Sequence, residues 1–503
     1  MLVMLALAGC PGGGATLGDV CSDTSDCASS LQCLGKTCVP RCQRGPDCGD
    51  GYGCDQSGIC VTATGQAGDT CASETDCAAG LSCQIDGTAR GANGNLLAAC
   101  TAQNVGRPTG AACAQDTECR DGTCALGRCI DLCATSHDCP IAATCMQIPR
   151  VLDANKKLVG PFGGCLPSQG SIQWSIPIAG PTEPGLLLPV PSGATSISAV
   201  FSVQDRNQLV GATHVVAPDG SVQYDLCRNA SCGDAFYTNP IRHAPALGES
   251  VLAIPSSPAF PLQAGVYALD VSSLRPDLVG GSAIPKLTVV AKLDASVILD
   301  LHFHFLDLSD HPCASALGVG TLNASTAPDA AFFKDDFVGE MKGIFAHGGI
   351  ALGVQTYDDI TGHPDLDGLD IADAASLLSL GGYASGVNVF FVRTLSPVGL
   401  EAFGPNPGPA GLANTAESGV VIGMDTLCYR TWTQVARLTA HEVARYMGLF
   451  HNVEAEVGAH AKWQDPIPDS DQSSSNLMFY SEFGGVDLSE GQREILSKSA
   501  VLR

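Results

Sequence analysis

Basic residues are scarce in this chain of 503 residues. Lys and Arg together number 26, against 51 Asp and Glu, which gives a formal net charge of −25. A surface of this sign repels nucleic acid phosphates and anionic lipid headgroups, so we expect no nucleic acid partner and no electrostatic attraction to lipid. Charged residues of both signs make up only 15% of the chain and apolar residues 45%, which excludes wholesale disorder.

Long apolar runs are also missing, and none reaches the ~18 residues that a membrane-spanning helix needs. The chain begins MLVMLALAGC, a short apolar run with no Lys or Arg before it. Its last four residues resemble the bacterial lipobox. We therefore expect a signal peptide over residues 1–9, with the true start codon upstream, a lipid on Cys10 and a linker over residues 10–20. The alternative is a truncated signal peptide of ordinary type.

Either alternative predicts an exported protein. With a lipid on Cys10, the protein would be anchored at the bacterial outer membrane or cell surface, from which it could later be shed. The cysteine content agrees with export, because 25 Cys persist as disulfides only in an oxidising compartment. The count is odd, and lipidation of Cys10 would leave 24 to pair.

Cys-x2-Cys pairs, which grip zinc, are absent from the chain, so the cysteines predict disulfides rather than metal sites. Twenty of them lie in residues 21–165 and form five quartets that each begin Cys-x5-Cys. An acidic residue precedes the second Cys in CSDTSDC, CASETDC and CAQDTEC, and Gly stands three residues before three of the quartets. We expect disulfide-stabilised repeats that form a stalk or an adhesive module, with the pairing left open.

Residues 166–294 contain short β-prone runs separated by turn residues. Runs such as SIQWSIPI, ATSISAVFSVQ and KLTVVAKL alternate apolar and polar positions at strand length. This pattern predicts an all-β sandwich that acts as a spacer or a binding domain. Cys227 and Cys232 are close enough in the sequence to close a small loop within it.

Residues 295–503 alternate strand-like and helix-like segments, which predicts an α/β (α+β) domain. In FFKDDFVGEMKGIF the apolar residues recur every four positions, as in an amphipathic helix: Phe333, Phe337, Met341 and Phe345. The run SGVVIGMD is expected to be an edge strand. Cys313 and Cys428 remain as a long-range disulfide.

The run HEVARYMGLFH, residues 441–451, carries the chemistry. On a helix, His441 and position 445 share a face, with Glu442 beside them. Gly448 can take the left-handed conformation that ends a helix, which would let His451 return to that face. This geometry makes a three-point metal cage in which Glu442 serves as base for a metal-bound water.

These residues resemble the signature of the metzincin zinc metallopeptidases, His-Glu-x-x-His-x-x-Gly-x-x-His followed by a Met-turn. His441, Glu442, Gly448 and His451 match it, and Met478 in SSSNLMFY stands at the Met-turn. The sequence segments around the motif are most similar to the pappalysin-like branch of this clan, in particular GLFHNVE and GPNPGPAGLANTAESGVVI. The resemblance covers residues 295–503 and implies zinc ligands at His441 and His451, a general base at Glu442, and a peptide or protein as substrate.

Arg445 stands where the pattern has its second His. Arg has five hydrogen-bond donors, no lone pair and a permanent charge, so it cannot bind zinc and repels it. We expect zinc binding to be weak at best, Arg445 to pair with a carboxylate such as Glu442, and the domain to bind peptides without efficient cleavage. Two alternatives stay open: an active zinc metalloendopeptidase in which His460 or Tyr480 completes the coordination, and a surface adhesion protein that acts through its Cys-rich repeats.

Two further groups are weaker candidates for metal ligands. His302 and His304 alternate in one strand and share a face, although such residues are more often satisfied within a sheet. Asp365, Asp367 and Asp370 offer oxygen atoms suited to Ca²⁺, although they lack a complete calcium loop. Capping of the following helix is the competing interpretation for these acidic residues.

Overall fold

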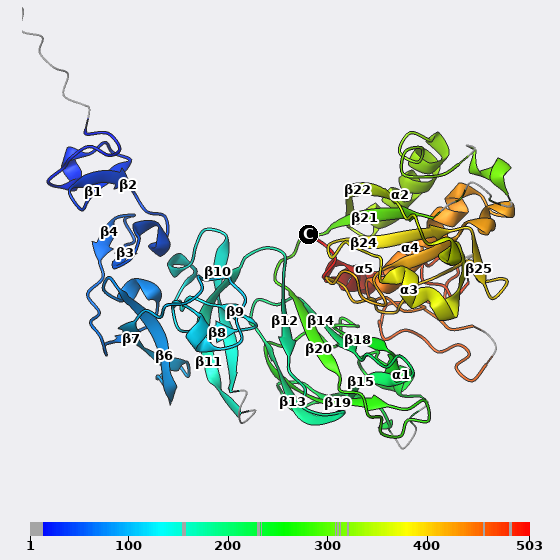
Figure 1. The fold of residues 1–503 in the computed structure, drawn as a ribbon, viewed down its shortest axis with the longest axis horizontal. Coiled ribbons are helices and arrows are strands. Elements are labelled where there is room, and N and C mark those ends of the chain that lie inside the picture. Colours follow the sequence, from blue (N-terminus) through cyan, green and yellow to red (C-terminus); the bar gives the residue numbers. More distant parts are fainter. Residues whose placement is uncertain are drawn as a thin grey trace, which may run out of the picture. The chain divides into compact units, whose positions relative to one another are not determined.

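The computed structural model describes residues 14–152, 157–228, 232, 234–306, 308, 311, 313–318, 321–455, 458–481 and 485–503. The expected signal peptide and Cys10 lie outside these residues. The chain divides into two compact units, Met1–Ser168 and Gln169–Arg503. The first is disulfide-rich and the second is a sheet-rich body with few helices, which confirms the predicted fold in these terms (Figure 1). No helix among the described residues has the length and apolar character needed to cross a membrane.

The disulfides of the first unit follow one rule. In each quartet the first Cys pairs with the third and the second with the fourth, which settles the connectivity that the sequence left open. The ten bonds are Cys21–Cys33, Cys27–Cys38, Cys42–Cys54, Cys48–Cys60, Cys71–Cys83, Cys77–Cys100, Cys113–Cys124, Cys119–Cys129, Cys133–Cys145 and Cys139–Cys165.

The acidic residue of each quartet has a local structural role. In the first quartet, Asp26 accepts hydrogen bonds from the backbone N–H groups of Ser22 at 2.7 Å and Asp23 at 3.1 Å, at the start of a 3₁₀ turn (Thr24–Asp26). These donors would otherwise lack partners at the start of the turn. Equivalent carboxylates accept from the backbone in the other four quartets: Asp47, Asp76, Glu118 and Asp138.

The glycines before three quartets also have a structural reason. Each has a positive φ, between +83° and +90°, which only glycine adopts at little cost. Each donates its N–H to the carbonyl of the fourth Cys of the quartet at 2.9 Å, in the pairs Gly18–Cys38, Gly68–Cys100 and Gly110–Cys129. The glycine therefore closes the module onto its own last cysteine.

The two disulfides of a quartet differ in how much chain they enclose. The first always joins residues 11 or 12 apart. The second joins residues 10 to 12 apart in three quartets, but 23 and 26 apart in the third and fifth. The extra residues form longer hairpins there, β6 (Leu81–Arg90) with β7 (Leu96–Ala102) and β10 (Ala143–Leu152) with β11 (Lys157–Pro167). The other hairpins are shorter: β1 (Leu31–Leu34) with β2 (Thr37–Pro40), β3 (Tyr52–Cys54) with β4 (Cys60–Thr62), and β8 (Cys124–Ala125) with β9 (Arg128–Cys129).

Two antiparallel sheets open the second unit. One has the order β12 (Ser171–Ile176), β20 (Lys286–Lys292), β14 (Ser196–Ser202), β18 (Glu249–Ile254). The other has the order β13 (Thr182–Val190), β19 (Gly265–Leu274), β15 (Leu209–Val216), β16 (Val222–Asp225), and β17 (Ala246–Leu247) pairs with β15. Strand β15 contacts β14 and β18, so the sheets pack together. The Cys227–Cys232 disulfide and the short helix α1 (Ala235–Thr238) follow β16.

A five-stranded sheet forms the core of the C-terminal part. Its order is β22 (Ala351–Asp359), β21 (Ile298–Phe305), β24 (Val387–Val392), β27 (Val420–Gly423), β26 (Ala402–Phe403), and only β26 runs antiparallel to its neighbour. The prediction that SGVVIGMD is an edge strand is wrong, because the two residues of β26 pair with β27 and take the edge instead.

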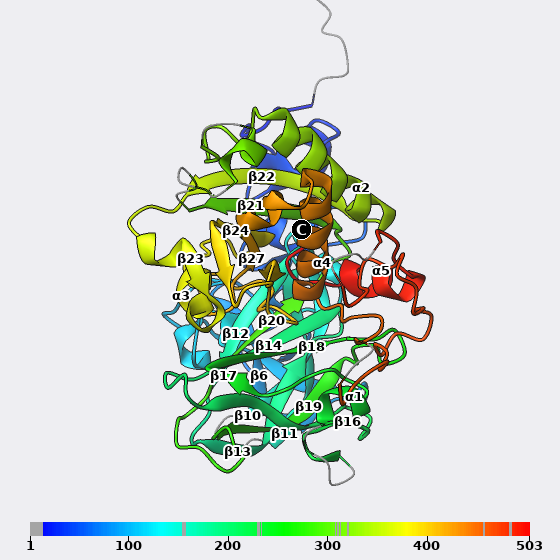
Figure 2. The same ribbon diagram turned by 90° about the vertical axis from the view of Figure 1, so that its right-hand side faces the viewer.

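Helices cover both faces of this sheet. A π-helical turn (Phe332–Val338) continues into α2 (Gly339–His347), which packs with α4 (Trp432–Tyr446) on one face (Figure 2). The short helix α3 (Ala374–Leu378) packs on the other face, against alternate residues of β24. The four apolar residues predicted to line the first helix are fully buried, as expected: Phe333, Phe337, Met341 and Phe345. The predicted Cys313–Cys428 disulfide is present, and α5 (Glu490–Ser497) is the last helix along the described residues.

A buried carboxyl group, Glu249, and a half-buried one, Glu417, interact electrostatically where β18 of the paired sheets approaches the C-terminal part. Glu249 is 6% exposed, and burial raises its pKa. Burial, and the charge of Glu249, raise the pKa of Glu417 to about 7, against an opposing effect of Arg206. Protonation of Glu417 at mildly acidic pH therefore favours the folded state.

We expect the second unit to lose stability as the pH rises from about 4.5 to about 7. The native state keeps a proton on Glu417 that an unfolded chain, with a pKa of 4.5, has already released. The full stabilisation is present below pH 4.5, and about 3 kcal/mol is lost by pH 7. The Glu417→Gln variant should show a flatter pH dependence by that amount in urea unfolding at pH 5 and pH 8. The exposed Asp365→Asn variant serves as control, and an unchanged slope in Glu417→Gln would contradict the assignment.

Candidate functional site

Helix α4 presents the motif residues together. It begins at Thr431, whose side chain accepts from the backbone of Gln434 while the side chain of Gln434 accepts from the backbone of Thr431. Gly448, at φ +114°, ends the helical path, as the sequence predicts. The chain then returns His451 to the helix, where its ring centroid lies 5.3 Å from that of His441.

Both imidazoles are oriented through Nδ1. His441 Nδ1 lies 2.7 Å from the carbonyl oxygen of Leu477, and His451 Nδ1 lies 3.3 Å from Oε2 of Glu454. A carbonyl oxygen can only accept a hydrogen bond, so Nδ1 of His441 carries the hydrogen and Nε2 keeps the lone pair. Burial lowers the pKa of His441 to about 4, which keeps the ring neutral at pH 7.

Met478 lies in the segment that supports both imidazoles. Its side chain is fully buried, and its backbone N–H donates to Oδ1 of Asn476 at 2.8 Å. Its carbonyl accepts from the N–H of Asn452 at 2.9 Å. Because Leu477 accepts from His441 and Asn452 follows His451, the segment around Met478 connects the supports of both imidazoles.

Arg445 forms an ion pair with the predicted base. Its Nη1 lies 3.3 Å from Oε1 and 3.2 Å from Oε2 of Glu442, whose side chain is 7% exposed. The pairing that the helical spacing allows is therefore present. Since the guanidinium has no lone pair, positions 441, 445 and 451 supply two metal ligands rather than three.

This donor set does not fit a zinc ion. A catalytic zinc site has three protein ligands and an open position, and a structural site has four. Among the described residues, every group of three or more candidate ligand atoms that lie close together consists of cysteines, and all of these cysteines are in disulfides. The residues present thus offer a pair of imidazoles beside a salt bridge.

The two candidate replacement ligands have other partners. His460 Nε2 lies 3.0 Å from Oδ1 of Asp234, and its ring stacks on Tyr237 with centroids 4.3 Å apart. Tyr480 is half-buried and packs against Phe479, with ring centroids 4.5 Å apart. The contacts of His460 direct its side chain to neighbours other than the two imidazoles.

His302 and His304 are satisfied within the sheet. His302 Nδ1 lies 2.9 Å from the hydroxyl of Thr356, and its Nε2 lies 2.9 Å from the carbonyl of Ser385. His304 Nε2 lies 2.9 Å from Oδ1 of Asn388. Burial lowers the pKa of both histidines, so they act as neutral hydrogen-bonding residues of β21.

The acidic group at residues 365–370 has structural partners too. Asp370 accepts a hydrogen bond from the N–H of Ala372 at 2.9 Å and caps the following turn. Asp367 forms an ion pair with Arg393 at 2.7 Å. Asp365 stays exposed. These contacts favour the capping interpretation for Asp370 and leave Asp365, Asp367 and Asp370 without a shared centre.

Sequence reasoning missed Glu454, which lies at the site. Burial tends to raise its pKa, but its hydrogen bond to His451 and the charges of His451, Arg445 and His460 lower it overall, so Glu454 is ionised at neutral pH. Its position three residues after His451 was the available signal, because that spacing lets one turn of chain bring the two side chains together.

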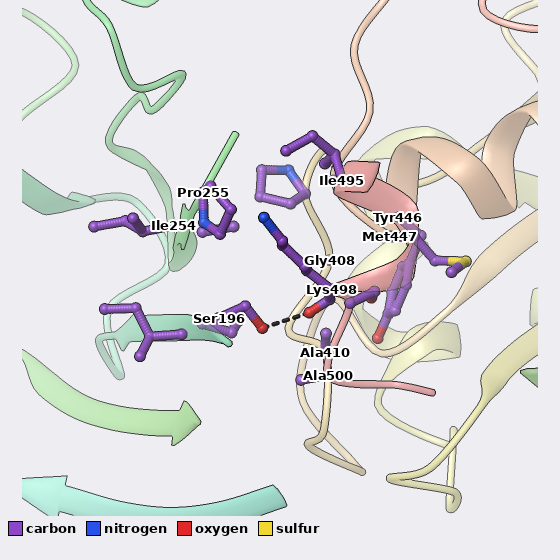
Figure 3. Close-up of a pocket in the computed structure, with 16 residues that line it drawn as sticks. Ser196, Ile254, Pro255, Gly408, Ala410, Tyr446, Met447, Ile495, Lys498 and Ala500 are labelled. Carbon is purple, nitrogen blue, oxygen red and sulfur yellow. Dashed lines mark hydrogen bonds between the residues drawn. The ribbon is translucent and has the colours of Figure 1, made fainter. Parts of the chain in front are cut away.

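A separate small cavity lies between β14 and β18 on one side and the end of α4 on the other (Figure 3). Tyr446, Met447 and Gly448 line it, and Ser196 Oγ donates to the carbonyl of Lys498 across it. His441, Glu442 and His451 are not among its lining residues. The cavity is therefore distinct from the site formed by the motif.

The fold and the site define a sheet-rich protein with a His-Glu helix, a returning histidine and a buried methionine. No protein-family model and no curated protein matches this chain.

Proposed function

We propose that residues 295–503 are a metzincin-like domain, closest to the pappalysin-like branch, that binds peptides or proteins and has lost efficient zinc-dependent cleavage. The observation that carries the proposal is the ion pair between Arg445 and Glu442, at 3.2 and 3.3 Å. The carboxylate that would activate a metal-bound water is held by a guanidinium, and the guanidinium stands at the missing ligand position.

The sheet edge beside the motif supports a peptide as the ligand. A Cβ placed on Gly404, next to β26, would lie 3.5 Å from Oε2 of Glu442. An edge strand presents backbone N–H and C=O groups that an extended peptide can pair with. A peptide paired with this edge would thus lie next to the residues that approach Glu442.

The first unit supports an exported protein. Its ten disulfides persist only where thiols are oxidised. We extend the proposal to a lipid anchor at Cys10, which places the peptide-binding domain at the bacterial outer membrane or cell surface.

A peptide library of random sequence tests the function. We expect the immobilised chain to retain a subset of the peptides and release no new fragments by mass spectrometry, with or without added zinc. His451→Ala should reduce retention, whereas Asp365→Ala, an exposed acidic position, should not. Fragments that vanish on addition of a chelator would instead show an active peptidase. Equal retention by residues 14–168 alone would assign binding to the Cys-rich repeats.

A further inference from the structure

We propose that residues 234–242, which belong to the region of the paired sheets (residues 169–294), are positioning residues for the returning loop that carries part of the His441–His451 site. The returning loop is defined as residues 450–455 and 458–464, which carry His451 and Glu454. This inference rests on the proposed function, because it concerns the same site. It makes the site a product of two sequence regions rather than of the motif domain alone.

The first contact is an aromatic pair at the start of the returning loop. The ring of Phe236, in α1, meets the ring of Phe450 edge to face, with centroids 5.3 Å apart. Phe450 is 3% exposed and directly precedes His451. Aromatic pairs in this geometry are favourable beyond the area that they bury. The contact therefore fixes the backbone from which His451 projects.

The second set of contacts is made with residues 458–464 of the loop. Tyr237 stacks on His460 at 4.3 Å and meets Trp463 edge to face at 4.8 Å. The neighbouring Asp234 pairs with His460 Nε2 at 3.0 Å. Thus one short helix and its preceding residue hold two side chains of the loop, by ring packing and by a hydrogen bond.

Arg242 completes the connection. It is 6% exposed, and its Nη1 donates to the carbonyls of Phe236, Tyr237 and Asn239 at 2.7 to 3.1 Å. Its Nη2 donates to the carbonyl of Gln464 at 3.2 Å. A single guanidinium thereby satisfies the end of α1 and binds it to the end of the returning loop.

Hydrogen bonds within the returning loop connect these contacts to His451. The N–H of Glu454 donates to the carbonyl of Trp463 at 2.8 Å, so the two limbs are paired. The carboxylate of Glu454 then contacts His451 Nδ1 at 3.3 Å. Outer partners of this kind orient an imidazole and set its affinity for whatever its other nitrogen binds. Burial, and the nearby charge of Glu454, raise the pKa of the Tyr237 phenol.

Zinc in an Arg445→His background is the probe. The full chain with Arg445→His supplies a third imidazole, and its zinc affinity, measured by competition with a chromophoric chelator, reports where His451 stands. Adding Phe236→Ala and Tyr237→Ala should weaken zinc binding by about tenfold or more, the effect typical of lost outer partners. Asp234→Asn, which keeps the side-chain volume, should weaken it in the same direction without unfolding the protein.

Matched variants separate the outcomes. Leu247→Ala with Val279→Ala removes exposed apolar side chains from the same paired sheets and should leave zinc affinity unchanged. If Arg445→His binds zinc and neither the α1 variants nor Asp234→Asn alters the affinity, the positioning role is refuted. If Arg445→His binds no zinc at all, the metzincin-like arrangement in the proposed function fails instead.

Discussion

Arg445→His is expected to raise the zinc content of the purified chain from trace to about one ion per molecule. His441 and His451 already face each other, with ring centroids 5.3 Å apart, and each is held through Nδ1. The substitution supplies a third lone pair on the same helical face as His441 and releases Glu442 from its ion pair. Elemental mass spectrometry of the dialysed chain, with its disulfides oxidised, measures the ratio directly.

Charge makes the expected difference large. At ~4 Å and an effective dielectric near 20, a dication beside a guanidinium costs on the order of 8 kcal/mol. That is comparable with the ~10 to 16 kcal/mol apparent binding free energy of whole structural zinc sites. Loss of a ligand and addition of this repulsion act together in the native chain, so its zinc affinity should lie many orders of magnitude below that of Arg445→His.

Two variants separate these contributions. Arg445→Met removes the charge without adding a ligand and should bind zinc weakly, while Arg445→Lys keeps the charge and should bind none. Arg445→Met also leaves Glu442 buried without its partner, so a lower melting temperature is expected for that variant. Near-stoichiometric zinc in the native chain would contradict the interpretation that Arg445 prevents zinc binding, and would require either His460, after leaving Asp234, or Tyr480 to complete the coordination.

Loss of the Cys139–Cys165 disulfide is expected to unfold the last quartet at physiological temperature. The bond joins residues 26 apart, and both cysteines are buried. The chain-entropy relation gives about 3.5 kcal/mol for a loop of this length, within the 2 to 5 kcal/mol typical of small disulfide-stabilised domains. Cys139→Ser with Cys165→Ser should therefore remove or strongly lower one transition in differential scanning calorimetry.

The second unit gives the matched control. Cys227→Ser with Cys232→Ser opens a disulfide between residues only 5 apart, for which the same relation gives about 2 kcal/mol. We expect each pair of substitutions to affect the transition of its own unit, since residues 1–168 and 169–503 are separately compact. If the Cys139→Ser, Cys165→Ser chain keeps every transition of the native protein, the disulfide is not needed for folding of its quartet.

The sequence predicted those features that depend on local periodicity or spacing. Apolar residues four apart identified the buried face of the first helix, and Phe333 and Phe345 at its two ends are fully buried. The helical spacing also anticipated that Arg445 can reach Glu442, three residues before it. These contacts lie within a few turns of chain, where backbone geometry fixes which side chains meet.

Features that depend on distant residues were not predictable in the same way. The partner of His460 is Asp234, 226 residues earlier, and nothing in either local sequence indicates the pairing. Strand β13 (Thr182–Val190) contains Pro and Gly, which indicated turns, and it carries an irregular register there. The edge strand β26 has two residues, too few for a periodic signal. In each case tertiary contacts decided the outcome.

The unequal disulfides of the quartets have a consequence for how such a chain can diversify. In each quartet the first disulfide encloses a nearly constant number of residues. The second disulfide lies at the base of a hairpin whose length differs between quartets. Lengthening that enclosed segment from 10 to 26 residues adds less than about 1 kcal/mol of closure entropy. Selection can thus extend and vary the hairpin tip at little cost in stability, as an antibody framework permits in its hypervariable loops. The disulfide pairing of the quartet stays the same.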